Sequence, residues 1–175
     1  MEDKKLNEER IEAKMRDLEL KLGYPFKNIS LLATAMGSIK RDNDGQGKNG
    51  SEYENERLAI VGDALLKFII VDKLFKDDNI ETKGKITEIK SYLENNLTMH
   101  NLMKSEGLIN YAYNNLHFYN DKDIPEHEKV VARKHDIYVE AIVGAIFYDS
   151  DYDTARKWIL ERLLPLLEKY KKTKN

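Results

Sequence analysis

The chain has 175 residues and a formal net charge of −2; 34% of its residues are charged, 41% are hydrophobic and none is cysteine. This balance is typical of one soluble globular domain rather than a disordered chain, and the missing cysteines exclude disulfides, thiolate nucleophiles and cysteine-ligated zinc. The near-neutral charge does not indicate a nucleic-acid binder, which is usually basic, although a basic face can coexist with acidic patches.

The N-terminal segment predicts an amphipathic helix over residues 5–22, because Ile11, Met15, Leu18 and Leu22 follow the spacing of one helix face. The charged start of the chain has no apolar core and is not a signal peptide. No apolar stretch approaches the roughly 20 residues that cross a bilayer. We therefore expect a cytoplasmic or otherwise intracellular protein.

A second short helix is predicted over residues 29–38, capped by Asn28 or Ser30. Residues 40–52 have three glycines and no large apolar group, which predicts a mobile loop. Its basic side chains could contact phosphate, but a plain solvated connector is the commoner role of such a loop.

The middle of the chain predicts two long helices, over about residues 53–76 and over 82–105, each from its apolar periodicity. Residues 107–128 are the least regular part. Their aromatic side chains could stack on nucleic-acid bases, or they could anchor a loop onto the core, which is the commoner role. The aromatic residues in question are Tyr111, Tyr113, Phe118 and Tyr119.

Residues 129–149 predict a helix that is apolar nearly all round at its end and therefore central and buried. Residues 151–170 predict a last helix that Pro165 bends or ends. The basic tail, about residues 168–175, could contact phosphates or simply fray in solvent. With no repeat and no convincing strand, the sequence predicts a single all-α domain over residues 1–175.

Two acids interrupt these apolar helices, Asp63 directly after Gly62 and Glu140 in the run that contains Gly144. An unpaired buried carboxylate is costly, so each acid needs a cation or a set of hydrogen-bond donors. Two core helices are expected to pack together, which would bring the two acids close. A glycine within a helix costs up to about 1 kcal/mol relative to alanine and is tolerated where backbones or a ligand come close.

Converging carboxylates are a typical site for Mg2+, which takes one or two carboxylates and keeps several waters. Such an ion can activate water and neutralise charge during phosphodiester hydrolysis. The alternative is that each acid bonds a local lysine or a helix terminus and has no further role.

Four segments, in order along the chain, match one known family. NERLAIVGDALL is similar to the signature helix of the ribonuclease III family, and VEAIVGAIFYDSDYDTARKWI resembles its second acidic helix and the helix that follows. LKLGYPFKNISLLATAM and KGKITEIKSYL resemble its opening segment and its middle helix. These matches cover nearly the whole chain, so chance similarity of an unrelated helical interaction module is a poor alternative.

The resemblance implies an all-helical endonuclease domain that forms a homodimer and cleaves double-stranded RNA with Mg2+, for which Mn2+ would substitute. Each protomer would cut one strand, leaving 5′-phosphates and short 3′ overhangs. By the motif match, Asp63 and Glu140 are the expected catalytic and metal-binding residues, and Ile60 takes an apolar position of the protomer interface. No membrane partner and no nucleotide cofactor are expected.

Glu56 falls on the first glutamate of the signature and is a further metal candidate. It lies about 10.5 Å from Asp63 along the helix axis, too far for both to grip one ion easily. It is better placed to bind a second water, an arginine or the partner protomer.

The sequence also departs from the family pattern. Ala59 replaces the second glutamate of the signature, and Ile137 replaces an expected aspartate. Asp136 is adjacent, but it is rotated by about 100° and would join the metal ligands only through a bulge or rewinding. A further acid of some members corresponds to Lys83. This reduced acid set is similar to that of the Mini-III subgroup.

We expect an active endoribonuclease with weakened metal affinity, because Mg2+ can manage with two carboxylates and phosphate oxygens. The alternative is a catalytically degenerate dimer that binds structured RNA or scaffolds a ribonucleoprotein. No C-terminal double-stranded-RNA-binding domain is expected, so phosphate contacts must come from the nuclease domain and be salt-sensitive. The basic candidates are Lys40, Arg41, Lys48, Lys83, Lys85, Lys90 and the tail lysines.

Overall fold

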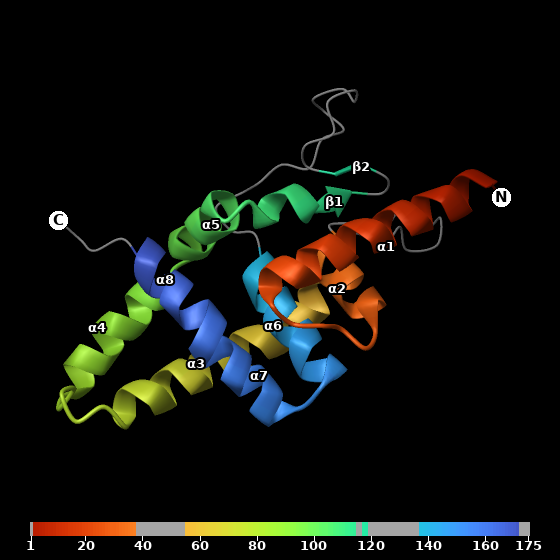
Figure 1. The fold of residues 1–175 in the computed structure, drawn as a ribbon. Coiled ribbons are helices and arrows are strands. Elements are labelled where there is room, and N and C mark those ends of the chain that lie inside the picture. The colour runs from red at the N-terminus through yellow and green to blue at the C-terminus, as the bar shows by residue number, and fades with distance from the viewer. Residues whose placement is uncertain (1, 38–54, 115–116, 119–136, 172–175) are drawn as a thin grey trace, which may run out of the picture.

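The computed structural model describes residues 2–37, 55–114, 117–118 and 137–171, and helices dominate these ranges (Figure 1). The helices are α1 (Glu2–Leu22), α2 (Ile29–Met36), α3 (Glu56–Phe75), α4 (Lys83–Leu93), α5 (Asn96–Ser105), α6 (Tyr138–Asp149), α7 (Tyr152–Trp158) and α8 (Leu164–Tyr170). The described residues also contain a 3-10 turn, η1 (Leu108–Tyr111), and a π-helical turn, η3 (Ile159–Leu163). The expected all-α class is confirmed.

The first two helices form as the sequence predicts. Met15, Leu18 and Leu22 of α1 are buried in the core. Gly23 follows with a φ of 64°, a left-handed conformation that glycine adopts without strain. Asn28 caps α2, since its side-chain oxygen accepts a hydrogen bond of 3.2 Å from the Ser30 backbone N–H. Of the two candidate caps, Asn28 is therefore the one used.

Helices α3 and α6 make the most extensive contact between elements and form the centre of the fold (Figure 1). Every residue of α6 from Tyr138 to Ile146 is buried. Helix α2 packs against α6 as well. The prediction that the two acid-bearing helices are neighbours is thus confirmed, and the burial of α6 follows from its apolar residues on all sides.

The predicted long helix over residues 82–105 is wrong, because the chain breaks between α4 and α5. Asn95 caps a new helix, with its side-chain oxygen accepting from Leu97 N at 2.8 Å. Thr98 donates its hydroxyl to Tyr92 O at 2.9 Å, so the break also satisfies a backbone carbonyl at the end of α4. Periodicity continues across the break and therefore did not reveal it.

A short antiparallel hairpin was also missed: β1 (Tyr113–Asn114) pairs with β2 (His117–Phe118). Tyr111, Tyr113 and Phe118 around it are buried. The Tyr111 hydroxyl donates to Asp17, and the Tyr113 hydroxyl donates to Ala33 O at 2.9 Å. These three rings anchor the segment onto α1 and α2 rather than offering a stacking surface, whereas Tyr119 lies outside the described residues.

The last predicted helix contains a π-helical turn directly before Pro165. Leu164 donates its backbone N–H to Ile159 O, five residues back. Proline has no N–H to continue the normal ladder, so the widened turn precedes it and α8 begins around it. Pro165 therefore neither ends the helix nor leaves it regular.

Asp149, at the end of α6, fixes the loop between α1 and α2. It accepts hydrogen bonds from Asn28 N at 2.7 Å, Lys27 N at 2.9 Å and the Tyr24 hydroxyl at 2.8 Å. Three donors satisfy this buried carboxylate.

Some expectations fall outside the described residues: the loop over 40–52, the start of the helix predicted over 129–149, and the last four residues of the tail. Across the ranges that are described, no helix is both long enough and apolar enough to span a membrane.

Candidate metal centre

The two predicted acids lie where α3 and α6 cross in backbone contact. A Cβ atom on Gly62 would lie 1.7 Å from the carbonyl oxygen of Glu140, and one on Gly144 would lie 2.2 Å from that of Leu58. Each helix therefore places one glycine against a backbone carbonyl of the other helix. On each helix the glycine and the contacted carbonyl lie four residues apart. The expectation that these glycines permit a close approach of backbones is confirmed.

Asp63 follows Gly62 on α3 and is partly exposed. Its Oδ2 lies 2.7 Å from Lys67 Nζ, and 43% of the Asp63 side chain and 46% of the Lys67 side chain are accessible to solvent. The expectation that Asp63 is buried within an apolar run is therefore wrong, because close to half of its side chain is accessible to solvent. The alternative of a local lysine partner is realised for this acid.

Glu140 is buried, with 7% of its surface exposed. Its Oε2 has no hydrogen-bond partner among the described residues. Burial raises the pKa of the Glu140 carboxyl and the nearby charge of Asp63 raises it further, whereas its own backbone N–H and the charge of Lys67 lower it. The structure thus brings Asp63 and Glu140 close enough for their charges to interact, and it leaves Glu140 Oε2 without a hydrogen bond in the described ranges.

Glu94 is a further carboxylate whose charge acts on this centre, and the sequence does not single it out. It caps the C-terminal end of α4, and its Oε2 lies 2.6 Å from Lys90 Nζ. Its Oε1 is buried without a hydrogen-bond partner in the described ranges. The charge of Glu94 also acts on Lys67. No sequence signal marks Glu94, whereas the four-residue spacing from Asp63 could have indicated Lys67.

The other predicted site residues stand apart from this pair. Glu56 is the first residue of α3, two turns before Asp63, and is not among the groups that shift the pKa of Glu140. Ala59 is buried, and Ile137 directly precedes α6 and packs partly buried on the core. Asp136 lies outside the described residues.

The described ranges contain no group of three or more His, Cys, Asp or Glu side chains positioned to hold a metal ion. Two carboxylates with one unsatisfied oxygen nevertheless fit Mg2+, which needs few protein ligands. The assignment of Asp63, Glu140, Glu56 and Asp136 as ligands remains a prediction.

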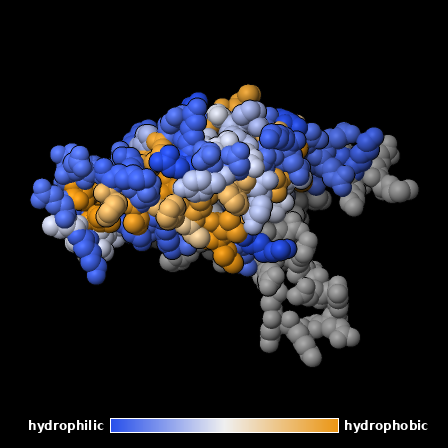
Figure 2. All heavy atoms as spheres, turned by 90° about the horizontal axis from the view of Figure 1, so that it is seen from below, coloured by the Kyte–Doolittle hydropathy of each residue, from blue (hydrophilic) through white to orange (hydrophobic). Residues whose placement is uncertain are grey.

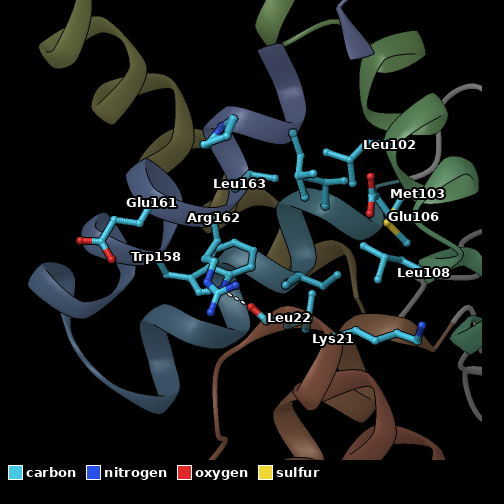
Figure 3. Close-up of a pocket in the computed structure, with 14 residues that line it drawn as sticks. Lys21, Leu22, Leu102, Met103, Glu106, Leu108, Trp158, Glu161, Arg162 and Leu163 are labelled. Atoms are coloured by element: carbon cyan, nitrogen blue, oxygen red, sulfur yellow. Dashed lines mark hydrogen bonds between the residues drawn. The ribbon is translucent and has the colours of Figure 1, made fainter. Parts of the chain in front are cut away.

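A cavity of about 420 Å³ lies elsewhere, between the end of α1, α5, α6 and η3 (Figure 3). Its walls are largely apolar, with Lys21, Glu106, Glu161 and Arg162 at its rim. Trp158 closes one side and donates its Nε1–H to Leu22 O at 2.8 Å. Neither Asp63 nor Glu140 lines it, so the cavity is separate from the candidate metal centre.

Two of the basic candidates for phosphate contact, Lys83 and Lys85, are exposed on α4. Lys85 pairs with Glu88 at 3.1 Å, and Lys90 is committed to Glu94. Lys40, Arg41 and Lys48 lie outside the described residues.

The family model described as Ribonuclease-III-like matches residues 46–167, more than half of the chain. Among curated proteins, Ribonuclease 3 of Francisella philomiragia is 32% identical over 146 residues, which are 83% of this chain and 56% of that protein. Ribonuclease 3 of Clostridium acetobutylicum is 32% identical over 155 residues, 89% of this chain and 62% of that protein. The chain thus spans less than two thirds of the length of these relatives.

Two solved structures of the nuclease domain of ribonuclease III from Campylobacter jejuni share the fold. One matches with a TM-score of 0.63 and 24% identity, covering 87% of this chain and 95% of that one, and is described as flexible in a region involved in dimer formation. The other matches with a TM-score of 0.62 and 23% identity, covering 93% and 97%. At these identities the likeness establishes the fold alone.

Proposed function

Because the chain belongs to the ribonuclease III family, we propose that it is a Mg2+-dependent endoribonuclease that hydrolyses phosphodiester bonds of double-stranded or structured RNA. Asp63 and Glu140 are the proposed catalytic and metal-binding residues. The proposal includes a homodimer as the working form and an intracellular setting. Mn2+ would substitute for Mg2+.

The observation that carries the proposal is the buried Glu140 carboxylate, whose Oε2 has no hydrogen-bond partner in the described ranges and whose pKa the charge of Asp63 raises. A purely structural glutamate in a core acquires hydrogen-bond donors, as Asp149 does in this same helix. Glu140 has instead been kept among apolar neighbours at a cost in stability. Such a group is characteristic of a functional site.

The chain's own residues would prepare the reaction in three ways. Gly62 brings the Glu140 backbone against α3, which fixes the separation of the two helices that carry the acids. Glu140 offers a carboxylate held in a dry environment, and partly exposed Asp63 faces solvent, from which RNA must approach. When bound between them, Mg2+ would supply an activated water and neutralise charge on the phosphate.

An exposed apolar face of α3 supports the homodimer. Ile60 is 72% exposed, Phe68 58% and Phe75 77%. The positions of these residues span an arc of about 80° on an ideal helix. The Phe68 ring lies 6.5 Å from that of Tyr152 on α7, and Figure 2 shows hydrophobic atoms gathered on the face seen from below. Contiguous apolar surface of this kind marks an interaction site, and a second copy would bury it.

A second candidate function is a catalytically degenerate dimer that binds structured RNA or scaffolds a ribonucleoprotein. Two observations favour it: no three-acid group occurs in the described ranges, and Asp63 already has Lys67 as its partner. This candidate predicts retained duplex binding without metal-dependent cleavage. Calorimetric titration with Mn2+ discriminates the two candidates. The enzyme should bind Mn2+ and lose that binding in Glu140→Gln, whereas a scaffold should show no Mn2+ binding that depends on Glu140.

The test of catalysis compares wild type, Asp63→Asn and Asp72→Asn on long duplex RNA with Mg2+. Asp72 is a matched control, since it lies on α3 and also pairs with a lysine four residues on, Lys76 directly after the helix, at 2.9 Å. We expect cleavage by wild type and Asp72→Asn, and its loss in Asp63→Asn. Equal cleavage by all three proteins, or none by any, would reject the catalytic assignment.

A further inference from the structure

The Lys67 ammonium is hydrogen-bonded to one carboxylate and is influenced by the charges of two others, one directly after α4 and one on α6. Its Nζ bonds Asp63 Oδ2 at 2.7 Å. That hydrogen bond raises the pKa of the Lys67 ammonium, and the charges of Asp63, Glu94 and Glu140 raise it further, although desolvation opposes the change. The ammonium is therefore within electrostatic reach of Asp63 on α3, Glu94 at the end of α4 and Glu140 on α6.

The three acids do not depend on Lys67 equally. Glu94 has its own cation, because Lys90 Nζ lies 2.6 Å from its Oε2. Glu140 has an Oε2 without a hydrogen-bond partner in the described ranges, and Lys67 is the cation that acts on its charge. Lys67 thus balances Asp63 and Glu140, the two proposed metal ligands.

We propose that Lys67 is a displaceable internal counterion of this centre. Its ammonium pairs with Asp63 until a divalent cation binds, and the lysine side chain then rotates into solvent. This inference rests on the proposed function, because it takes Asp63 and Glu140 to be the cation's ligands. Lys67 is a positioning residue that sets metal affinity and does not itself enter the chemistry.

The contact geometry makes displacement feasible. The side chains of Asp63 and Lys67 are both close to half exposed, and ion pairs so exposed are weak because water screens them. The lysine stem has four flexible carbons, so the ammonium can leave Asp63 without any movement of the backbone. A divalent ion carries twice the charge and can also bind Glu140 Oε2, which forms no hydrogen bond in the described ranges.

Displacement does not remove Lys67 from the neighbourhood. It stays one helical turn from Asp63, and its positive charge repels the incoming cation. The same charge offsets repulsion between Asp63 and Glu140 when no metal is bound. Metal affinity should therefore be lower than the two carboxylates alone would give, and the metal-free centre should be more stable.

The experiment titrates MnCl2 and MgCl2 by calorimetry into wild type, Lys67→Gln, Lys67→Arg and Lys76→Gln. Lys76→Gln removes the same kind of four-residue ion pair at the C-terminal end of the same helix, about 13.5 Å further along its axis. Lys67→Arg keeps the charge. We expect Lys67→Gln to bind Mn2+ on the order of tenfold more tightly than wild type, from the lost repulsion at a separation of about 6 Å. We expect the other two variants to bind like wild type.

Two further measurements check the electrostatic origin. The advantage of Lys67→Gln should shrink at high salt, which screens the ammonium. Metal should also raise the melting temperature of Lys67→Gln more than that of wild type, because tighter binding to the native state adds stability. This readout does not depend on RNA cleavage.

Asp63→Asn separates the failure of this inference from the failure of the proposed function. If Asp63→Asn abolishes metal binding but Lys67→Gln binds no more tightly than wild type, the counterion role is wrong and the metal centre stands. If neither wild type nor Lys67→Gln binds metal, both are wrong. Tighter binding by Lys76→Gln as well would show a general charge effect and overturn the specific role of Lys67.

Discussion

Gly62 and Glu140 are in contact through their backbones, since a Cβ atom on Gly62 would lie 1.7 Å from the Glu140 carbonyl oxygen. The residue before the candidate ligand Asp63 therefore sets how close the second ligand can come. The same glycine therefore serves packing and the candidate metal centre, because it allows α3 and α6 to cross closely and so brings together the two helices that carry the carboxylates.

Gly62→Ala should be strongly destabilising. The added methyl group overlaps backbone rather than a movable side chain, so α3 and α6 must separate, and we expect a loss of about 3 kcal/mol or more in the free energy of unfolding. Gly84→Ala in α4 is the control, because its nearest neighbouring atom would lie at 4.0 Å. That change should be neutral or stabilising by up to about 1 kcal/mol. Urea denaturation measures both, and equal effects would contradict the close crossing.

Glu140→Gln should stabilise the metal-free protein while removing its response to metal. Burial raises the pKa of Glu140, so the native state holds this proton more strongly than the unfolded state, and the group's contribution to stability falls as pH rises. Removing the charge should raise the free energy of unfolding at neutral pH by about 1 kcal/mol. Asp63→Asn, which breaks a half-exposed pair, should give no such gain. Thermal melts with and without Mn2+ measure both effects.

Asp149 should account for part of the loss of folding stability at acid pH. Burial opposes its ionisation, but hydrogen bonds from Asn28 N, Lys27 N and the Tyr24 hydroxyl outweigh burial and lower its pKa. A lowered native pKa means that this stability is present above the unfolded-state pKa and is lost as pH falls through the native one. Asp149→Asn should cost about 2 kcal/mol at neutral pH.

The pH dependence of Asp149→Asn gives the sharper check. The variant should lose less stability than wild type between neutral and acid pH, because the titrating group is gone. Asp153→Asn, an exposed acid in the first turn of α7, should follow the wild-type curve. Parallel curves for Asp149→Asn and wild type would show that the three hydrogen bonds do not carry the acid dependence.

Ile60→Asp should weaken self-association without unfolding the protomer. Ile60 is exposed on α3, so a charge there costs little in the monomer but is unfavourable in an apolar interface, where we expect about 2 kcal/mol or more per dimer. Leu20→Asp is the control, because Leu20 is 77% exposed on α1, away from this face. Sedimentation at micromolar concentration should show dimers for Leu20→Asp and monomers for Ile60→Asp. A monomeric wild type would reject the dimer itself.

The elements with strong local signals could be predicted from sequence. The extents of α1 and α3 follow from apolar periodicity, and Gly23 marks the end of α1. The burial of α6 follows from its lack of a polar face. The break before Asn95 and the π-helical turn before Pro165 could not be predicted. Both depend on which backbone groups find partners in the folded chain, and hydrophobic spacing does not record this.

The candidate centre divides in the same way. The sequence by itself determined the two odd acids, the glycines beside them and the helices that carry them, because a carboxylate or a glycine in an apolar run is visible without coordinates. Only the tertiary structure decided that Asp63 is half exposed and bound by Lys67, that Glu140 is buried with an unsatisfied oxygen, and that Glu94 lies nearby. Exposure and charge balance arise from how three helices cross, and no single helix contains that information.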